Sequence, residues 1–311
     1  MTTSSKPHTI RIATRQSPLA LWQANTVMDR LKAINVPCEM MLIESSGDLN
    51  LTSPVYAMGI TGVFTKELDI ALLEKRADIS VHSLKDVPTQ VAAGLSVQAV
   101  LERGSSADIL ISKESFNPEK ATQIATSSLR RRAQWLMRYP HHTIAPIRGN
   151  VQTRLRKFNE NIDIEGVIFA KAGLERMNLL NGNITILDWM LPAPAQGIVG
   201  VVCRSEDEEI CKIMNQINHQ PTFIEGAIER EFMRTLLGGC SVPVSALAKT
   251  DGETITFKGA IHAIDGSRCN IVEKTISTTH WKGLGMQAAQ ELLQQEGAES
   301  LLNEIRAKNE K

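Results

Sequence analysis

Short apolar runs with β propensity alternate with amphipathic helical runs through the first two-thirds of the chain, and this alternation constrains the fold most strongly. Residues 9–14 predict a first strand. A helix is expected over residues 18–34, because Ser17 suits the N-cap, Pro18 suits the first turn, and apolar residues recur every three or four positions. The pattern is typical of α/β domains with largely parallel sheets.

A polar segment at residues 102–107 separates this first α/β run from a second one. The 311 residues are enough for two or three domains, and 42% hydrophobic residues allow each to bury a core. An apolar strand expected at 198–203 is placed where it would suit a return to the first sheet. The second run alternates expected strands at 107–112, 123–125, 143–147 and 166–170 with expected helices near 128–138, 151–160 and 173–180.

The character of the chain changes from about residue 220. A helix expected at 223–237 precedes two alternating runs, 255–262 and 269–276, that predict a hairpin with Asp265-Gly266 in its turn. A last helix closes the chain. We therefore predict three domains: a discontinuous α/β domain of residues 1–102 and 198–216, a second α/β domain of residues 103–197, and a small α+β domain of residues 217–311.

Charge and composition exclude several classes of protein. The 34 Lys and Arg residues balance the 34 Asp and Glu residues, so no global field attracts nucleic acid or an acidic membrane. No apolar run is long enough to span a bilayer, and the first eight residues lack the apolar stretch of a secretory signal, so we expect a cytoplasmic protein. The five scattered cysteines contain no C-x-x-C pair and the histidines no H-E-x-x-H spacing, so we predict neither a disulfide framework nor a metal site.

Arginines cluster where strands give way to helices. Residues 126–132, Thr-Ser-Ser-Leu-Arg-Arg-Arg, open one such helix, so hydroxyls, free backbone N–H groups and guanidinium groups meet at its positive end. Residues 148–154 repeat the arrangement, and residues 14–17 make a third instance. Any one of these could be a solvated surface charge. Three at strand ends indicate a shared crevice, and a polyanionic small molecule fits it better than DNA.

Two single residues also suggest chemistry. Asp86 follows the strand expected at 79–82, where a carboxylate could hold a developing positive charge or move a proton; alternatively it caps the turn or pairs with Lys85, and the residues alone favour that second interpretation. Cys240 follows two glycines, which favours an accessible thiol, although free cysteines are most often buried. The string 283–288 matches a dinucleotide-binding pattern, but no strand precedes it, so we treat it as chance.

Taken together, the strings resemble those of one family over nearly the whole chain: porphobilinogen deaminase, also called hydroxymethylbilane synthase. The resemblance does not rest on any single motif. It is carried by Arg11-Ile-Ala-Thr-Arg-Gln-Ser-Pro-Leu-Ala20, Val81-His-Ser-Leu-Lys-Asp-Val-Pro88, Thr126-Ser-Ser-Leu-Arg-Arg131, Arg148-Gly-Asn-Val-Gln-Thr-Arg154, Gln196-Gly197, Glu229-Arg230 and Gly238-Gly-Cys-Ser-Val-Pro243.

The resemblance implies a transferase that deaminates porphobilinogen, joins four molecules head to tail and releases hydroxymethylbilane. It implies a dipyrromethane cofactor held by a thioether at Cys240, and Asp86 as the residue that stabilises the cation formed when ammonia leaves. Family positions that hold acetate and propionate carboxylates correspond to Arg15, Ser17, Lys85, Ser128, Arg130, Arg131, Arg148, Arg154 and Arg176. Other residues expected in the cleft are Thr126, Ser127, Gly149 and Gln196.

The implied fold is two α/β domains similar to periplasmic binding proteins, with a third domain that carries the cofactor loop, and we expect a monomer. A segment after Gly47-Asp48 resembles the family's mobile loop. Two positions depart from the family pattern: Thr61 stands where a lysine is usual, and Leu237 where a glutamate is usual. A non-catalytic, polyanion-binding relative of the same fold is the alternative hypothesis. Substitution of Asp86 separates the two, because a binder does not need that carboxylate.

Overall fold

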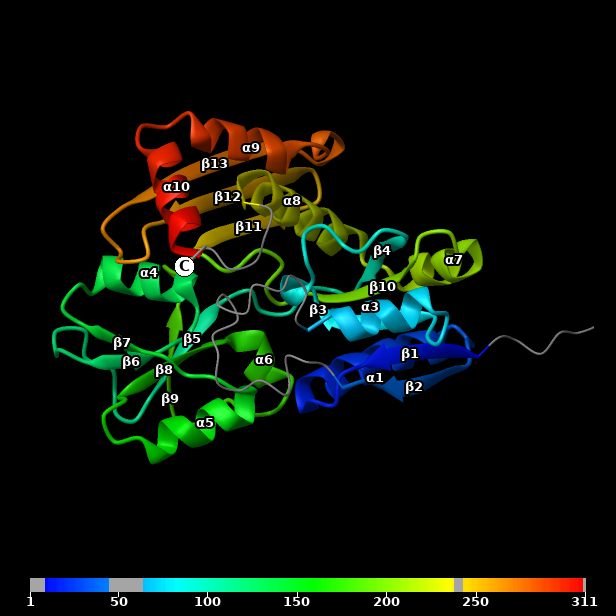
Figure 1. Ribbon diagram of the computed structural model, residues 1–311, viewed down its shortest axis with the longest axis horizontal. Coiled ribbons are helices and arrows are strands. Elements are labelled where there is room, and N and C mark those ends of the chain that lie inside the picture. Colours follow the sequence, from blue (N-terminus) through cyan, green and yellow to red (C-terminus); the bar gives the residue numbers. More distant parts are fainter. Residues whose placement is uncertain (1–8, 45–63, 238–242, 310–311) are drawn as a thin grey trace, which may run out of the picture.

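The computed structural model describes residues 9–44, 64–237 and 243–309, which fold around three β-sheets (Figure 1). The first sheet has the strand order β2-β1-β3-β10-β4. Strands β1, β2 and β3 are parallel, whereas β10 is antiparallel to both of its neighbours. The strands are β1 (Ile10–Thr14), β2 (Cys38–Leu42), β3 (Ile79–Ser83), β4 (Leu95–Val100) and β10 (Val199–Arg204).

Helices cover both faces of the first sheet, as expected where parallel strands are joined by helical crossovers. Side chains alternate along β1, so Ile12 faces α1 (Pro18–Ala33) and α7 (Glu208–Ile217), whereas Ala13 faces α3 (Lys66–Leu73). The N-cap of α1 is Ser17, whose side chain accepts from Ala20 N.

The second sheet repeats the plan of the first, with the order β7-β6-β8-β5-β9. Strands β6, β7 and β8 are parallel, and β5 is antiparallel to both β8 and β9. Helix α4 (Leu129–Arg138) packs on one face through Trp135, and α5 (Val151–Glu160) packs on the other through Phe158. The remaining elements are β5 (Asp108–Ser112), β6 (Gln123–Ala125), β7 (Thr143–Ala145), β8 (Gly166–Ala170), β9 (Asn183–Leu187) and α6 (Lys171–Glu175).

The chain passes twice between these two sheets. Residues 101–107 lead from β4 to β5, and residues 188–198 lead from β9 back to β10. The predicted return of the strand at 198–203 to the first sheet is confirmed, because β10 lies between β3 and β4. The return passage leads into β10, whose first residue pairs with the last residue of β3, and the first passage leads into β5, whose first residue pairs with the last residue of β8. The carboxyl ends of the parallel strands therefore lie next to the two passages.

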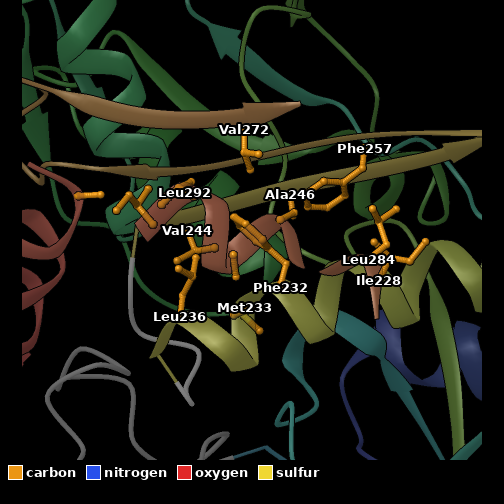
Figure 2. Packing of buried hydrophobic residues seen from close by; sticks show 14 of the residues in the cluster. Ile228, Phe232, Met233, Leu236, Val244, Ala246, Phe257, Val272, Leu284 and Leu292 are labelled. Carbon is orange, nitrogen blue, oxygen red and sulfur yellow. The ribbon is translucent and has the colours of Figure 1, made fainter. Parts of the chain in front are cut away.

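The third sheet is antiparallel, with the order β11-β12-β13, and helices cover one of its faces. Figure 2 shows Phe232 and Leu236 of α8 packed with Val244 and Ala246 of β11 and Phe257 of β12. The elements are β11 (Val244–Thr250), β12 (Thr254–His262), β13 (Cys269–Ser277), α8 (Gln220–Leu237), α9 (Leu284–Leu293) and α10 (Ala298–Asn309).

A buried ion pair ties this third unit to both passages. Arg103 Nη1 lies 2.6 Å from Glu229 Oε1 on α8, and Arg103 Nε donates to Gln196 O at 3.0 Å. Ala195 N in turn donates to Glu229 Oε2 at 2.6 Å. Helix α8 is therefore anchored to the segments that join the first two sheets.

The predicted fold class, two α/β units followed by a small α+β unit, is confirmed. The sequence predicts two strands in the last unit, whereas the structure has a third, β11, whose alternating Ala residues carry little β propensity of their own. Strands β4 and β9 and helix α7 are likewise absent from the sequence-based prediction. The helix expected at 173–180 ends at Glu175, and the backbone turns over at Asn178, which has a φ of 52°. None of the described helices is long and apolar enough to cross a membrane.

Candidate active site

Two strand ends of the first sheet present the residues that the sequence singles out there. Strands β1 and β3 are parallel neighbours, so the segments that follow them lie at the same edge. Arg15 follows β1 directly. Lys85 and Asp86 lie in the single 3₁₀ turn (Leu84–Asp86) that follows β3, where Asp86 is exposed and Lys85 half-buried.

The parallel strands of the second sheet direct three segments to one edge in the same way. Thr126, Ser127 and Ser128 follow β6, Arg148 and Gly149 follow β7, and α6 and then Arg176 follow β8. Strand β5 is antiparallel, so its first residue, Asp108, lies at this edge as well and is paired with Ala170, the last residue of β8.

The two edges are electrostatically coupled, which brings Lys85 and Asp86 of the first sheet within range of the charges of the second. Burial lowers the pKa of Lys85 to about 8; its neighbours Asp86 and Asp108 oppose that shift, and Arg131 and Arg130 add to it. The charge of Arg131, in the same sheet, lowers the pKa of Arg154, whereas the charge of Asp86, in the other sheet, raises it. The Lys85-Asp86 turn therefore faces the arginines of α4 and α5.

Asp108, which the sequence-based prediction missed, organises the arginines of α4. Arg130 Nη1 donates to Asp108 Oδ2 at 2.7 Å, and Arg131 Nη2 donates to Asp108 Oδ1 at 2.8 Å. Arg131 also donates through Nη1 to the carbonyl of Ile168, 3.0 Å away. Burial would raise the pKa of Asp108, but the charges of Arg130 and Arg131 outweigh it and hold that pKa well below its usual range. The only signal in the sequence was an Asp at the start of an expected strand, and its arginine partners are at least 22 residues further along the chain.

Arg154 is held differently, by an aromatic ring instead of a carboxylate. Its Cζ lies 4.7 Å from the ring centroid of Phe169. Burial and the charge of Arg131 lower the pKa of Arg154 to about 10. The Nε atoms of Arg154 and Arg130 are both buried without a hydrogen-bond partner. Such donors are costly to leave unpaired, so they are suited to an acceptor group from a ligand.

Arg15 and Arg176 lie farther along the same edges. Arg15 Cζ stacks 4.4 Å from the centroid of Phe64. Arg176 Cζ lies 5.2 Å from the ring of Trp22 on α1, and its Nη2 donates to Gly197 O at 2.6 Å. Arg176 therefore bridges the second sheet to the first sheet and to the return passage.

The predicted hydroxyl and backbone groups have structural partners. Ser17 and Ser128 cap α1 and α4, and Ser128 Oγ accepts from Arg131 N at 3.4 Å. Ser127 Oγ donates to Ile147 O at 2.8 Å, and Thr126 Oγ1 accepts from Ser128 N at 3.2 Å. These contacts shape the helix starts.

Gly149 and Gln196 have equally specific environments. Gly149 has a φ of 115°, and a Cβ built there would lie 2.6 Å from Thr153 Cγ2, so only glycine fits. Gln196 Nε2 donates to Asp108 Oδ1 at 3.0 Å, whereas its buried Oε1 has no partner. Gln196 therefore connects the return passage to the arginine cluster.

Some predicted features lie outside the described residues: Cys240, the segment after Gly47-Asp48 and Thr61, as well as the side chain of Leu237. Among the described residues, four cations (Lys85, Arg130, Arg131 and Arg154) share the site with two carboxylates, Asp86 and Asp108. The excess of positive charge, with two unpartnered N–H groups, is suited to an organic polycarboxylate. Asp86 is exposed and is not among the carboxylates that pair with these arginines.

Comparison with known proteins agrees with this chemistry. Residues 10–212 match a family model described as "Porphobilinogen deaminase, dipyromethane cofactor binding domain", and residues 223–294 match "Porphobilinogen deaminase, C-terminal domain". The chain belongs to the porphobilinogen deaminase family. The family resemblance, the enzyme class and the dipyrromethane cofactor predicted from the motifs are thereby confirmed.

Relatives in this family align over most of the chain. "Porphobilinogen deaminase" of Syntrophomonas wolfei is 38% identical over 296 residues, covering 93% of this chain and 96% of the relative. "Probable porphobilinogen deaminase" of Methanocaldococcus jannaschii is 45% identical over 258 residues, covering 81% and 87%.

Several solved structures are similar to this chain at lower identity. The VFT2 domain of Bordetella pertussis BvgS has a TM-score of 0.42 at 12% identity, covering 67% of this chain and 86% of that chain. The GluR0 ligand-binding core with L-glutamate has a TM-score of 0.39 at 10% identity, covering 68% and 92%.

Proposed function

We propose that this member of the family condenses four porphobilinogen molecules head to tail, losing one ammonia at each addition, and releases hydroxymethylbilane by hydrolysis. The observation that carries the proposal is the Lys85-Asp86 turn of the first sheet, which faces the arginines of the second. The arginines suit the carboxylates of the substrate and product, and the turn supplies an available carboxylate beside them.

Asp86 is the proposed catalytic residue. When the bond between the aminomethyl carbon and nitrogen breaks, ammonia departs with the electron pair and positive charge develops on the pyrrole. The exposed carboxylate of Asp86 can stabilise that charge and accept the proton lost when the next ring couples. Asp108 is unsuited to this role, because Arg130 and Arg131 occupy both of its oxygens.

The proposed carboxylate-binding groups are the cations at the two sheet edges, with the capped helix starts behind them. Arg154 and Arg130 each have an Nε without a partner, and Lys85 adds a compact ammonium. Cys240 would hold the dipyrromethane through a thioether, and the group would supply the primer for chain growth when bound. The full proposed set is Arg15, Ser17, Lys85, Ser128, Arg130, Arg131, Arg148, Arg154 and Arg176, with Thr126, Ser127, Gly149 and Gln196 shaping the cleft.

We also propose that the domains divide at the two passages: residues 1–102 with 198–216, residues 103–197, and residues 217–311. The strand orders support this division, because each five-stranded sheet keeps its own neighbours. We further propose that the protein is cytoplasmic and that it is a monomer. Light scattering coupled to size-exclusion chromatography would test the monomer. A mass of twice 34.2 kDa would contradict it.

Substitution Asp86→Asn tests the catalytic assignment. We expect product formation to fall by about 10²-fold or more, which is the usual contribution of a positioned acid or base. Binding of porphobilinogen, measured by calorimetry, should remain within a few-fold. Asp163→Asn is the matched control, because Asp163 is exposed and precedes β8, at the opposite edge of the second sheet. Normal turnover by Asp86→Asn would overturn the assignment.

Intact-mass measurement with peptide mapping tests the proposed attachment. We expect an adduct of two pyrrole units on the peptide that contains Cys240. Cys240→Ala should lack the adduct, whereas Cys269→Ala, which removes another free thiol of the third unit, should retain it. A bare chain that stays bare after incubation with porphobilinogen and hydroxymethylbilane would favour the non-catalytic, polyanion-binding alternative.

A further inference from the structure

The turn that carries Lys85 and Asp86 is short and weakly held by its own hydrogen bonds. It is a single 3₁₀ turn, and Ser83 at its start makes no side-chain capping bond. Leu84 N donates to Ile198 O at 2.9 Å, and Val87 N donates to Leu84 O at 3.2 Å. These two bonds fix the beginning of the turn, so the path of the chain after Asp86 needs another constraint.

That constraint comes from helix α8 of the third unit. Arg230 Nη1 donates to Val87 O at 2.8 Å, and Arg230 Nη2 donates to Pro88 O at 2.7 Å. Longer contacts run from the same two nitrogens to Leu84 O at 3.3 Å and Thr89 O at 3.5 Å. One guanidinium thus gathers four backbone carbonyls, which lie before and after Lys85 and Asp86.

The chemistry of this contact requires a guanidinium. Carbonyl oxygens drawn together repel each other unless a strong donor lies between them, and Val87 is extended, with φ −80° and ψ 127°, so it has no helical partner. A planar fork of N–H groups can serve several acceptors in one geometry, whereas a lysine ammonium is a single point charge.

Helix α8 is itself fixed where Arg230 leaves it. The preceding residue, Glu229, is fully buried and accepts from Ala195 N in the return passage and from Ala248 N of β11, 2.7 Å away. Adjacent residues on a helix point in different directions. Glu229 therefore anchors the helix while Arg230 reaches the turn.

We propose that Arg230 is a positioning residue, which holds the 84–89 backbone so that the Asp86 carboxylate meets the reacting pyrrole. The inference rests on the proposed function of Asp86. Arg230 bonds to backbone oxygens of that turn and does not act on the substrate. Loss of its fork should allow the turn to shift, and a shift of about 1 Å at a catalytic group can cost about 10²-fold in rate.

A pocket beside Arg230 makes the proposal testable by chemical rescue. The pocket has a volume of about 250 Å³ and is lined by Thr89, Ala227, Arg230, Glu231, Arg234 and Trp281. Truncation of the Arg230 side chain would enlarge this space next to the four carbonyls. A free guanidinium ion is small enough to enter and has the same donors.

The experiment compares Arg230→Ala with Arg234→Ala in the full-length, cofactor-loaded protein. We expect Arg230→Ala to lower kcat by about 10- to 100-fold, with KM within about threefold, because the arginines of the second sheet, which supply most of the carboxylate-binding cations, stay in place. Guanidinium chloride at millimolar concentration should restore much of kcat, and sodium chloride of equal ionic strength should not. Arg234 lines the same pocket but is largely exposed, so Arg234→Ala should keep its rate and show no rescue.

Hydrogen exchange supplies a readout that is independent of turnover. In Arg230→Ala, amides of residues 84–90 should exchange faster than in the unaltered protein and slow again with guanidinium, whereas residues 244–262 should be unchanged. Arg230→Lys, which keeps the charge but not the fork, should show an intermediate rate and serves if the alanine variant is unstable.

The outcomes separate this inference from the proposed function. Unchanged kcat and exchange in Arg230→Ala, or exchange that rises throughout α8 with no rescue, would overturn the positioning role. If Asp86→Asn turns over normally, the catalytic assignment fails instead. Slowing of exchange at residues 84–90 of Arg230→Ala by guanidinium would still establish that Arg230 holds the turn.

Discussion

Lys85 should make ligand binding depend on pH in the mildly alkaline range. Its pKa is lowered from 10.5 to about 8 by burial, so above pH 8 the unliganded site loses this positive charge. Above that pH, binding of a carboxylate ligand requires Lys85 to take up a proton. The affinity should therefore fall by about tenfold for each pH unit above 8. Lys85→Arg should abolish the fall, because arginine stays charged. Calorimetric titration with porphobilinogen from pH 7 to 10 measures both proteins; a flat profile in the unaltered protein would contradict the argument.

A second prediction concerns Asp108, because removal of one charge there leaves two buried arginines unbalanced. We expect Asp108→Asn to lower the free energy of unfolding by about 3–5 kcal/mol and to weaken ligand binding as Arg130 and Arg131 move. Asp78→Asn is a matched control: Asp78 is also buried and also pairs with two arginines, Arg11 and Arg204. It lies immediately before β3, at the end of that strand opposite to Lys85 and Asp86.

Denaturant titration and ligand binding together distinguish the two variants. Asp78→Asn should lose stability alone, and Asp108→Asn should lose stability and affinity. Equal binding in both would mean that the Asp108 cluster only supports the fold.

Individual residues of the site were predictable where chemistry and chain position coincide. Ser128 and Arg131 could be placed from sequence, because a capped helix start after a strand is a local pattern. Asp108 and Arg230 could not, since each acts on residues at least 22 positions away along the chain. Their partners are set by the packing of sheets and helices, which leaves no periodic signal.

At the scale of elements, the glycines that resemble a dinucleotide-binding string have a packing role. Gly283 precedes α9 with a φ of 80°, and Gly285 lies where α9 crosses α8. A Cβ at Gly285 would lie 2.3 Å from Ile228 O and 2.7 Å from Phe232 N, so the helices could not approach as they do. A strand, β13, does precede the string in the structure, but α9 is followed by α10 and not by a second strand, so the string does not open a βαβ unit.

Substitution Gly285→Ala should therefore destabilise the third unit. We expect a loss of about 1–3 kcal/mol from overpacking, even though alanine is the better helix former. Gly173→Ala is the control, because a Cβ there meets only Leu19 Cδ2 at 3.8 Å. Thermal unfolding of both variants measures the difference; equal melting temperatures would show that α8 and α9 can separate without cost.

Elements were predictable where one face is consistently apolar, as in α1 and β12. They were not predictable where a strand forms only because a neighbouring strand pairs with it. Strand β11 contains three alanines or serines in its first five residues and is a strand because β12 pairs with all of it. The edge strands β4 and β9 similarly depend on β10 and β5, which come from distant parts of the chain.

At the scale of the whole molecule, the Arg103–Glu229 pair should make the three sheets unfold together. Arg103 belongs to one passage, Glu229 to α8, and Ala195, which donates to Glu229, to the other passage. Glu229→Gln places an amide against N–H groups that need an acceptor and leaves Arg103 with only Glu225, 3.5 Å away, as a charged partner. We expect a loss of about 3–5 kcal/mol.

Calorimetry tests this prediction through the number of transitions. The unaltered protein should show one transition, and Glu229→Gln should show an earlier, separate one for the third unit. Lys258→Gln is a suitable control, because its pair with Glu273 is exposed and should contribute little. Two transitions in the unaltered protein would show that the pair does not couple the units.

The strand order of the first sheet also has a consequence for biosynthesis. Strand β4 meets the rest of its sheet only through β10, which begins at Val199, whereas every strand of the second sheet lies between Asp108 and Leu187. As the polypeptide leaves the ribosome from its N-terminus, the second sheet can close first. The sheet that begins the chain must wait, with β3 unpaired on one side and β4 without its partner strand, until the ribosome has translated past codon 204.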